Sequence, residues 1–162
     1  MRPFGNVTYS NFTYEDFRFQ TLGTRLGSPA GTLDSLIVRD YSGKAVAGTP
    51  EITFNAGLDF DLLEGLYGNV VYSYRGETPF AYPQTPQFPD SVDVAEAYQI
   101  LNAKLGIRRA FGRFEVNAYG GADNFTGAQY YNMLFSNQLP DAYIPAKPEM
   151  TWYTGFGAQY RF

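Results

Sequence analysis

The sequence predicts an all-β fold: an antiparallel up-and-down transmembrane β-barrel segment of about six strands. Three observations predict it. Apolar and polar residues alternate over long runs, and the connections between the runs are alternately long and short. Aromatic residues make up 18% of the chain, whereas charged residues make up only 17%. Aromatic side chains favour strands, and tyrosine suits the boundary between an apolar and a wet surface.

The composition excludes several kinds of site. The 162 residues include no His and no Cys, and 12 basic against 16 acidic residues give a net charge of −4. Without these residue types the chain has no thiolate nucleophile, no histidine base and no zinc site of the usual kind. We find no catalytic motif, so we expect no enzyme activity, no cofactor and no metal site. The acidic balance argues against nucleic acid as a partner.

The chain contains no run of about 20 apolar residues, which excludes a transmembrane helix. The mean hydropathy of −0.29 does not exclude a membrane protein. Strands of a transmembrane barrel alternate apolar and polar side chains, which averages the hydropathy.

The first predicted strand, near residues 4–19, is the least regular. Val7 and Tyr9 alternate well, but Phe12 and Tyr14 fall on the other side. A β-bulge or an aromatic rim would explain this change of phase.

The second and third predicted strands, near 50–63 and 66–76, show the clearest alternation. A short break at Leu63-Glu64-Gly65 separates them, so they read as a hairpin. The run 51–62 is long enough to cross a bilayer core when tilted. Its apolar side chains occupy every second position: Ile52, Phe54, Ala56, Leu58, Phe60 and Leu62.

The fourth and fifth predicted strands, near 95–110 and 112–124, form another hairpin, and the sixth, near 151–162, ends the sequence. The three long connections, about 20–49, 77–94 and 125–150, alternate with tight links. In an up-and-down meander all long loops then lie at one end of the sheet and all tight turns at the other. Long extracellular loops and short periplasmic turns are typical of outer-membrane barrels.

Several stretches resemble the closing strands of TonB-dependent outer-membrane receptors. GGADNF (120–125) followed by QYYN (129–132) is similar to the family's N-L-F-D…Y segment. PAKPE (145–149) leads into TWYTGFGAQYRF (151–162), which resembles the family's closing strand with its terminal Phe. Upstream, DYSGK (40–44) and GTPE (48–51) resemble a loop and a proline-bearing strand entry. The likeness extends from about Val7 to Phe162.

The resemblance implies a role in active uptake of a scarce nutrient of the siderophore, cobamide or glycan class. It places the chain in the outer membrane of a Gram-negative bacterium, where it would close the barrel and supply extracellular loops. Receptors of this family have about 22 strands around a plug. The implied partners are outer-membrane lipid, the remaining strands and plug (from the same parent protein or a separate chain) and the barrel-assembly machinery. The TonB complex would act indirectly, through the plug.

Three sets of residues are candidates for a functional role. Loop aromatics are candidates for ligand contact, against the alternative that they pack loop on loop: Phe80, Tyr82, Tyr130, Tyr131 and Phe135. The final strand resembles the barrel-assembly signal at Phe156, Ala158, Tyr160 and Phe162. Inward polar residues would line a substrate path or pair with one another: Asp59, Asp61, Arg75, Lys104, Arg108, Arg113, Glu115 and Arg161.

Two other interpretations stay open. A small self-associating outer-membrane pore would need no other polypeptide. A soluble β-rich ligand-binding module would use the loop aromatics, but the uninterrupted apolar face of residues 52–62 argues against it.

Overall fold

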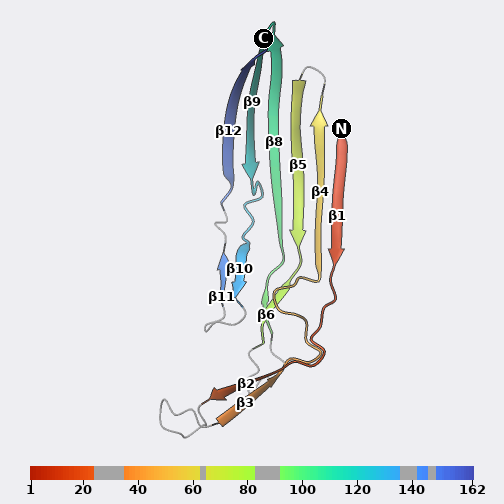
Figure 1. The fold of residues 1–162 in the computed structure, drawn as a ribbon, viewed down its shortest axis with the longest axis vertical. Coiled ribbons are helices and arrows are strands. Elements are labelled where there is room, and N and C mark those ends of the chain that lie inside the picture. The colour runs from red at the N-terminus through yellow and green to blue at the C-terminus, as the bar shows by residue number, and fades with distance from the viewer. Residues whose placement is uncertain (24–34, 63–64, 83–91, 136–141, 146–148) are drawn as a thin grey trace.

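A computed structural model covers residues 1–162 and describes the chain outside 24–34, 63–64, 83–91, 136–141 and 146–148. The predicted all-β fold and its antiparallel sheet of six strands are confirmed, in the order β1-β4-β5-β8-β9-β12 (Figure 1). Within the described residues no helix is long and apolar enough to span a membrane. The strands are β1 (Arg2–Tyr9), β4 (Ile52–Asp61), β5 (Leu66–Arg75), β8 (Tyr98–Phe111), β9 (Phe114–Asp123) and β12 (Thr151–Tyr160).

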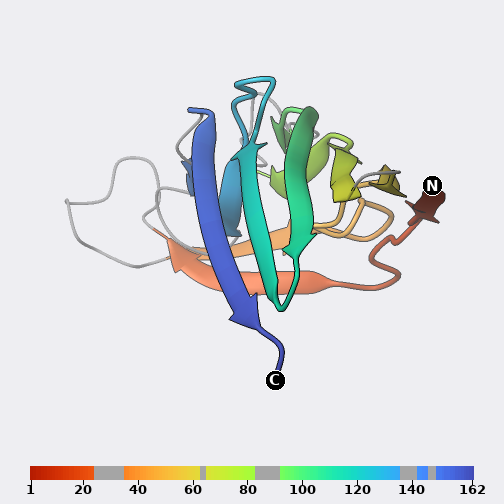
Figure 2. The same ribbon diagram turned by 90° about the horizontal axis from the view of Figure 1, so that it is seen from above.

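The sheet is open. β1 and β12 form its two edges, and each has a paired neighbour on one side only. Figure 2 looks down on the molecule from the tight-turn end. It shows the strands of the main sheet in a row, with the shorter strands of the loops at their far end. Neighbouring strands are antiparallel throughout, so β1 and β12 run in opposite directions.

Each long connection carries a short hairpin, which was not predicted from the sequence. The pairs are β2 (Arg18–Gly23) with β3 (Ser35–Asp40), β6 (Thr78–Ala81) with β7 (Asp93–Ala95), and β10 (Tyr131–Phe135) with β11 (Ala142–Pro145). All three hairpins lie at one end of the sheet, whereas the tight links and the C-terminus lie at the other (Figure 1). The predicted sorting of long and short connections is therefore confirmed.

The prediction that the first strand reaches residue 19 is wrong. β1 ends at Tyr9, and its pairing with β4 ends in the backbone hydrogen bond from Ser10 N–H to the Glu51 carbonyl at 2.8 Å. β4 begins only at Ile52, two residues after Pro50, so residues beyond Ser10 have no partner strand in the main sheet. The phase change in the sequence marks this strand end and not a bulge.

Glycine occupies a left-handed backbone position at both tight links. Gly112 takes a φ of +62° in the two-residue turn between β8 and β9, where a primed hairpin turn favours glycine at its first central position. Gly65, with φ +77°, precedes β5, and a Cβ there would lie 1.9 Å from the carbonyl oxygen of Arg108. The backbone of β8 thus approaches too closely for any side chain at residue 65.

The packed core lies under the loops and not in the sheet. Phe80, Ala81, Ala95 and Tyr131 form a buried cluster, against which Tyr98 packs. Ala122 is the one residue of the main sheet among the buried hydrophobic residues of the described chain. The sheet therefore has no hydrophobic core of its own within the described structure.

Candidate functional site

The strand register divides the main sheet into two chemically different faces. Residues directly opposite each other in an antiparallel pair project to the same side of the sheet. Val7, Phe54 and Tyr74 are opposed across three strands, and so are Phe111, Phe114 and Tyr160. We call this side the apolar face. Its other members include Ile52, Leu58, Phe60, Leu66, Val70, Leu101, Leu105, Ile107, Val116, Ala118, Trp152 and Phe156.

The apolar face is exposed. Val7 is 69% exposed, Leu105 53% and Phe156 73%, and these residues lie on three different strands. Soluble monomers rarely expose apolar patches larger than a few hundred Å², and an exposed patch of that kind marks a protein or membrane contact. The surface therefore fits an apolar environment better than water.

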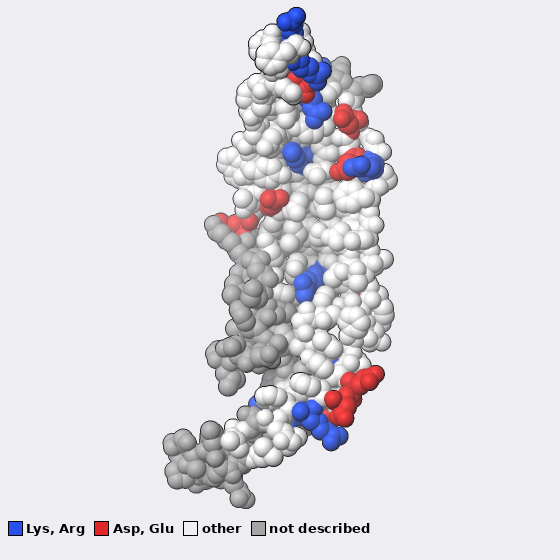
Figure 3. Space-filling view, in the orientation of Figure 1, with Lys and Arg blue, Asp and Glu red and all other residues white. Residues whose placement is uncertain are grey.

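The opposite side, the polar face, carries paired charges. Arg2 and Asp59 form an ion pair at 2.7 Å between β1 and β4. Glu115 on β9 lies between Arg108, at 3.7 Å, and Arg161, which also contacts it. The charged side chains are scattered over a largely uncharged surface (Figure 3). These ion pairs connect neighbouring strands, in agreement with the interpretation that the inward charges pair with one another and do not line a substrate path.

Arg113 corrects one of the inward predictions. It lies in the turn between β8 and β9, and its Nη1 donates to the Tyr160 hydroxyl at 3.4 Å, on the apolar face. A turn residue does not follow the strand alternation from which its direction was predicted. Asp61 and Lys104 do lie on the polar face, where Asp61 opposes Tyr67.

Tyrosine rings on the polar face lie over glycines, an arrangement that sequence reasoning missed. A Cβ on Gly106 would meet the Tyr67 ring at 2.4 Å, and one on Gly155 would meet the Tyr119 ring at 2.3 Å. Lys104 Nζ lies 4.2 Å from the Tyr119 ring centroid, a cation–π distance. In each case the tyrosine lies directly opposite the glycine on the neighbouring strand. Such an aromatic–glycine pair is the sequence signal from which the ring position could have been predicted.

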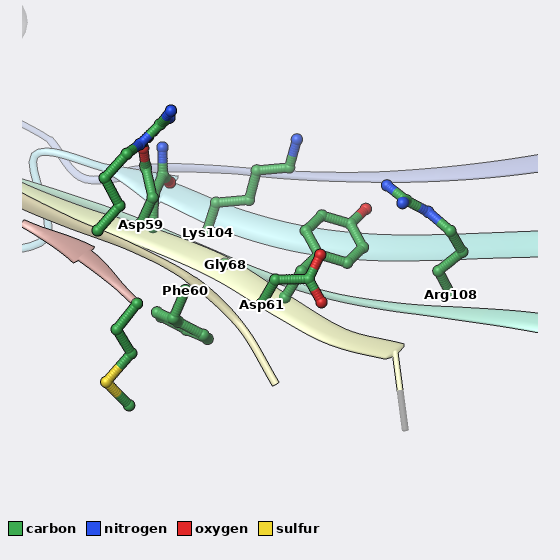
Figure 4. A pocket seen from close by; sticks show the side chains of 10 residues that line it. Asp59, Phe60, Asp61, Gly68, Lys104 and Arg108 are labelled. Carbon is green, nitrogen blue, oxygen red and sulfur yellow. Dashed lines mark hydrogen bonds and ion pairs between the residues drawn. The ribbon is translucent and has the colours of Figure 1, made fainter. Parts of the chain in front are cut away.

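An open depression of about 550 Å³ lies at the tight-turn end, where β4 ends and β5 begins. Figure 4 shows Lys104 and Arg108 extending to one side of the sheet, and Phe60 lying on the other. Asp59 and Asp61 are the acidic groups among its lining residues. Among the described residues no cluster of His, Cys, Asp or Glu has the size to hold a metal ion. The depression offers charged groups of both signs.

The predicted ligand-contact residues form part of the loop packing. Phe80, Tyr82 and Tyr131 are each no more than 9% exposed. The Tyr131 hydroxyl donates to Thr78 Oγ1 at 2.7 Å, and the Tyr82 hydroxyl donates to the Ala45 carbonyl at 2.6 Å. Tyr130 is half-buried, with its ring centroid 5.5 Å from that of Tyr98. The backbone of Phe135 belongs to β10, and its side chain lies outside the described part. In this arrangement ligand contact by the three buried rings requires the loops to open.

Arg75 connects the end of β5 to this loop packing. Its Nη2 donates to the Gly48 carbonyl at 3.2 Å, and its guanidinium lies 5.4 Å from the Tyr131 ring centroid. The residue predicted to line a path therefore anchors the loop that carries Gly48.

Asn124 shapes the start of the last long connection, and sequence reasoning assigned it no role. Its φ is +52°, which Asn tolerates better than most residues. Its Nδ2 donates to the Ala128 carbonyl and its Oδ1 accepts from the Ala128 N–H, both at 2.9 Å. The Asn102 side-chain oxygen accepts the Asn124 N–H at 2.9 Å. The GGADNF stretch thus ends in a side-chain-stabilised turn.

The base of the β2–β3 hairpin holds an aromatic chain and an ionised carboxylate. Tyr41 lies between Phe17, at 5.5 Å, and Tyr82, at 5.9 Å between ring centroids. Hydrogen bonds from the Ser42 side chain and backbone N–H, helped by the nearby Arg18 guanidinium, hold the pKa of Asp40 below its ordinary value, against an opposing effect of burial. A lowered pKa makes these contacts stabilising above the ordinary pKa, and the contribution is lost as the pH falls through the folded-state value. Burial raises the pKa of the Tyr82 hydroxyl, which keeps it a hydrogen-bond donor.

The residues of the predicted assembly signal share one face at the end of the sheet. Phe156, Ala158 and Tyr160 oppose Ala118, Val116 and Phe114, all on the apolar face. β12 ends at Tyr160, so Phe162 lies beyond the strand, although its ring packs edge-on against Tyr160 at 5.3 Å.

No protein-family model matches the sequence, and no curated protein is significantly similar to it. The likeness to TonB-dependent receptors therefore remains an expectation that rests on the motifs quoted above.

Proposed function

We propose that this chain is part of the wall of a β-barrel in a bacterial outer membrane, with its apolar face toward lipid and its polar face toward the lumen. The observation that carries the proposal is the exposed, largely apolar face that extends across all six strands from β1 to β12, opposite a face of paired charges. Barrel strands that separate lipid from a polar interior alternate in this way. A soluble module would leave the apolar face in water.

Within that class we propose a TonB-dependent transporter for a scarce nutrient, of the siderophore, cobamide or glycan class. The terminal motifs and the sorting of long and short connections support this narrower assignment. The two edges then pair with the remaining strands of the barrel. The plug, which the TonB complex engages, faces the polar side. The chain's own role is to close the barrel, present loops and carry the assembly signal.

Trp152 provides the test of the lipid-facing assignment. It is the single tryptophan, is 71% exposed, and lies on the apolar face at the loop end of β12. We expect lipids brominated in the acyl chain to quench its fluorescence after reconstitution, with headgroup-side bromines quenching most because the residue lies near the rim. Equal emission in brominated and ordinary vesicles would contradict the proposal.

A small self-associating pore is the second candidate, favoured by the edge strands. β1 and β12 run in opposite directions, so β1 of one copy can pair antiparallel with β12 of the next. Native mass spectrometry of the chain extracted in mild detergent from its own membrane separates the two proposals. A larger partner that carries strands and a plug supports the transporter, whereas a homo-oligomer that conducts ions supports the pore.

A further inference from the structure

A single charged residue lies among the strand positions of the apolar face, and it lies at the tight-turn end. Arg109 on β8 opposes Val116 on β9, and the next pair on the same face is Phe111 with Phe114. Charged residues on the lipid side of a barrel destabilise it strongly at mid-bilayer and little near the interfaces. The position of Arg109 is therefore one where a lipid-facing charge is tolerated.

A second arginine turns toward the same side. Arg113, in the turn, donates to the hydroxyl of Tyr160, and the Tyr160 ring lies 5.0 Å from that of Phe114. The rings around these arginines are open to the surroundings, with Phe111 65% and Phe114 56% exposed. We call this group the rim cluster: Arg109, Phe111, Arg113, Phe114, Tyr160 and Phe162.

We infer that the rim cluster docks the phosphate of a phospholipid headgroup, with a preference for anionic lipid. Guanidinium groups bind phosphate oxygens through paired N–H donors. Aromatic side chains sit at the level of the headgroups, where one end of the ring is apolar and the other is wet. The cluster lies where the apolar face ends, so a phospholipid whose acyl chains lie against Ile107 and Val116 would bring its headgroup to the end of the sheet that carries both arginines.

This inference rests on the proposed membrane function and goes beyond it. A cationic patch for a protein partner is less well supported, because the arginines continue directly into the exposed apolar face. An arginine on the polar face at the same end of the sheet serves as the comparison for Arg109. Arg108 is the sequence neighbour of Arg109 but points to the opposite side, where it pairs with Glu115.

The test measures vesicle partition of the chain with Arg109→Gln, Arg113→Gln, both together, and Arg108→Gln as the matched control. The vesicles are phosphatidylcholine alone, and phosphatidylcholine with a minor fraction of phosphatidylglycerol. We expect the preference for phosphatidylglycerol to fall by about fivefold for each rim arginine removed, because a cation near the headgroups contributes about that factor. The control keeps the wild-type preference, and partition into phosphatidylcholine alone stays unchanged.

Two results would overturn the inference. An unchanged phosphatidylglycerol preference in the double variant means that the rim cluster does not dock headgroups. An equal loss with Arg108→Gln means that only total charge matters. In both cases partition into phosphatidylcholine is retained and the proposed membrane function stands. Failure of the wild-type chain to enter either kind of vesicle contradicts the proposed function itself.

Discussion

The six-stranded sheet and the loop end differ in where their apolar side chains go. In the sheet, large residues such as Leu105 and Phe156 are exposed on a broad face. At the loop end, Phe80 and Tyr131 belong to one buried cluster, and the Tyr131 hydroxyl donates a hydrogen bond to Thr78. The loop end folds as a soluble protein does, with apolar groups inside. The sheet does not, so its stability depends on what covers its apolar face, and this difference leads us to assign the face to lipid.

The largest expected effect is from a charge placed on the apolar face. Leu105 lies near the middle of β8, so Leu105→Arg should destabilise the lipid-inserted chain by about 2–4 kcal/mol, the cost of such a charge near mid-bilayer. Ser73→Arg, on the polar face of the neighbouring strand β5, is the control and should cost far less. Urea unfolding from vesicles measures both. Similar losses for the two variants would show that the faces are not chemically distinct.

Alanine substitutions at two glycines of β12 compare a crowded and an open position on the polar face. Gly155→Ala places a Cβ 2.3 Å from the Tyr119 ring, whereas nothing lies within 4 Å of a Cβ at Gly157. Because an overpacked site forces its neighbours to move, we expect Gly155→Ala to cost about 1–3 kcal/mol and Gly157→Ala much less. Unfolding in denaturant reads out both. Equal costs would mean that the ring does not rest on Gly155.

Removal of a hydroxyl tests the loop end. Tyr131→Phe deletes the donor to Thr78, which is fully buried, so we expect a loss of about 1 kcal/mol. The change should raise protease cleavage in the loops and leave lipid insertion of the sheet intact. Tyr130→Phe, on the half-buried neighbouring ring, is the control. A loss of insertion in Tyr131→Phe would show that the two regions do not form independently.

The smallest effect is expected for the polar-face ion pairs. Glu115→Gln removes the common partner of Arg108 and Arg161, both of which are more than half exposed. Solvated pairs contribute little, so we expect less than about 1 kcal/mol, decreasing further with added salt. A loss of several kcal/mol, independent of salt, would mean that this face is dry and not in contact with water.

Much of the sheet was predictable because its physics is local. The alternation at Ile52 to Phe60 and the turn at Gly112 fix strands and links without reference to distant residues. The packing of the loops on one another was not predictable, since it depends on contacts such as the hydrogen bond from Tyr82 to Ala45, which lie far apart in the sequence. Arg113 was misplaced because alternation does not extend through a turn. The candidate ligand residues were found as aromatics, but their burial is a tertiary property.

Cysteine scanning along β8 tests the central claim most directly, because the chain has no cysteine of its own. Single cysteines at residues 101–105, 107 and 108, leaving out Gly106 because a side chain there would collide with Tyr67, are labelled after reconstitution with a membrane-impermeant maleimide and, separately, with a lipid-soluble reagent. The account predicts strict alternation: lipid-phase labelling at Leu101, Ala103, Leu105 and Ile107, and aqueous labelling at Asn102, Lys104 and Arg108. Aqueous labelling of both sets, without alternation, would show that the apolar face does not meet lipid and would contradict the account.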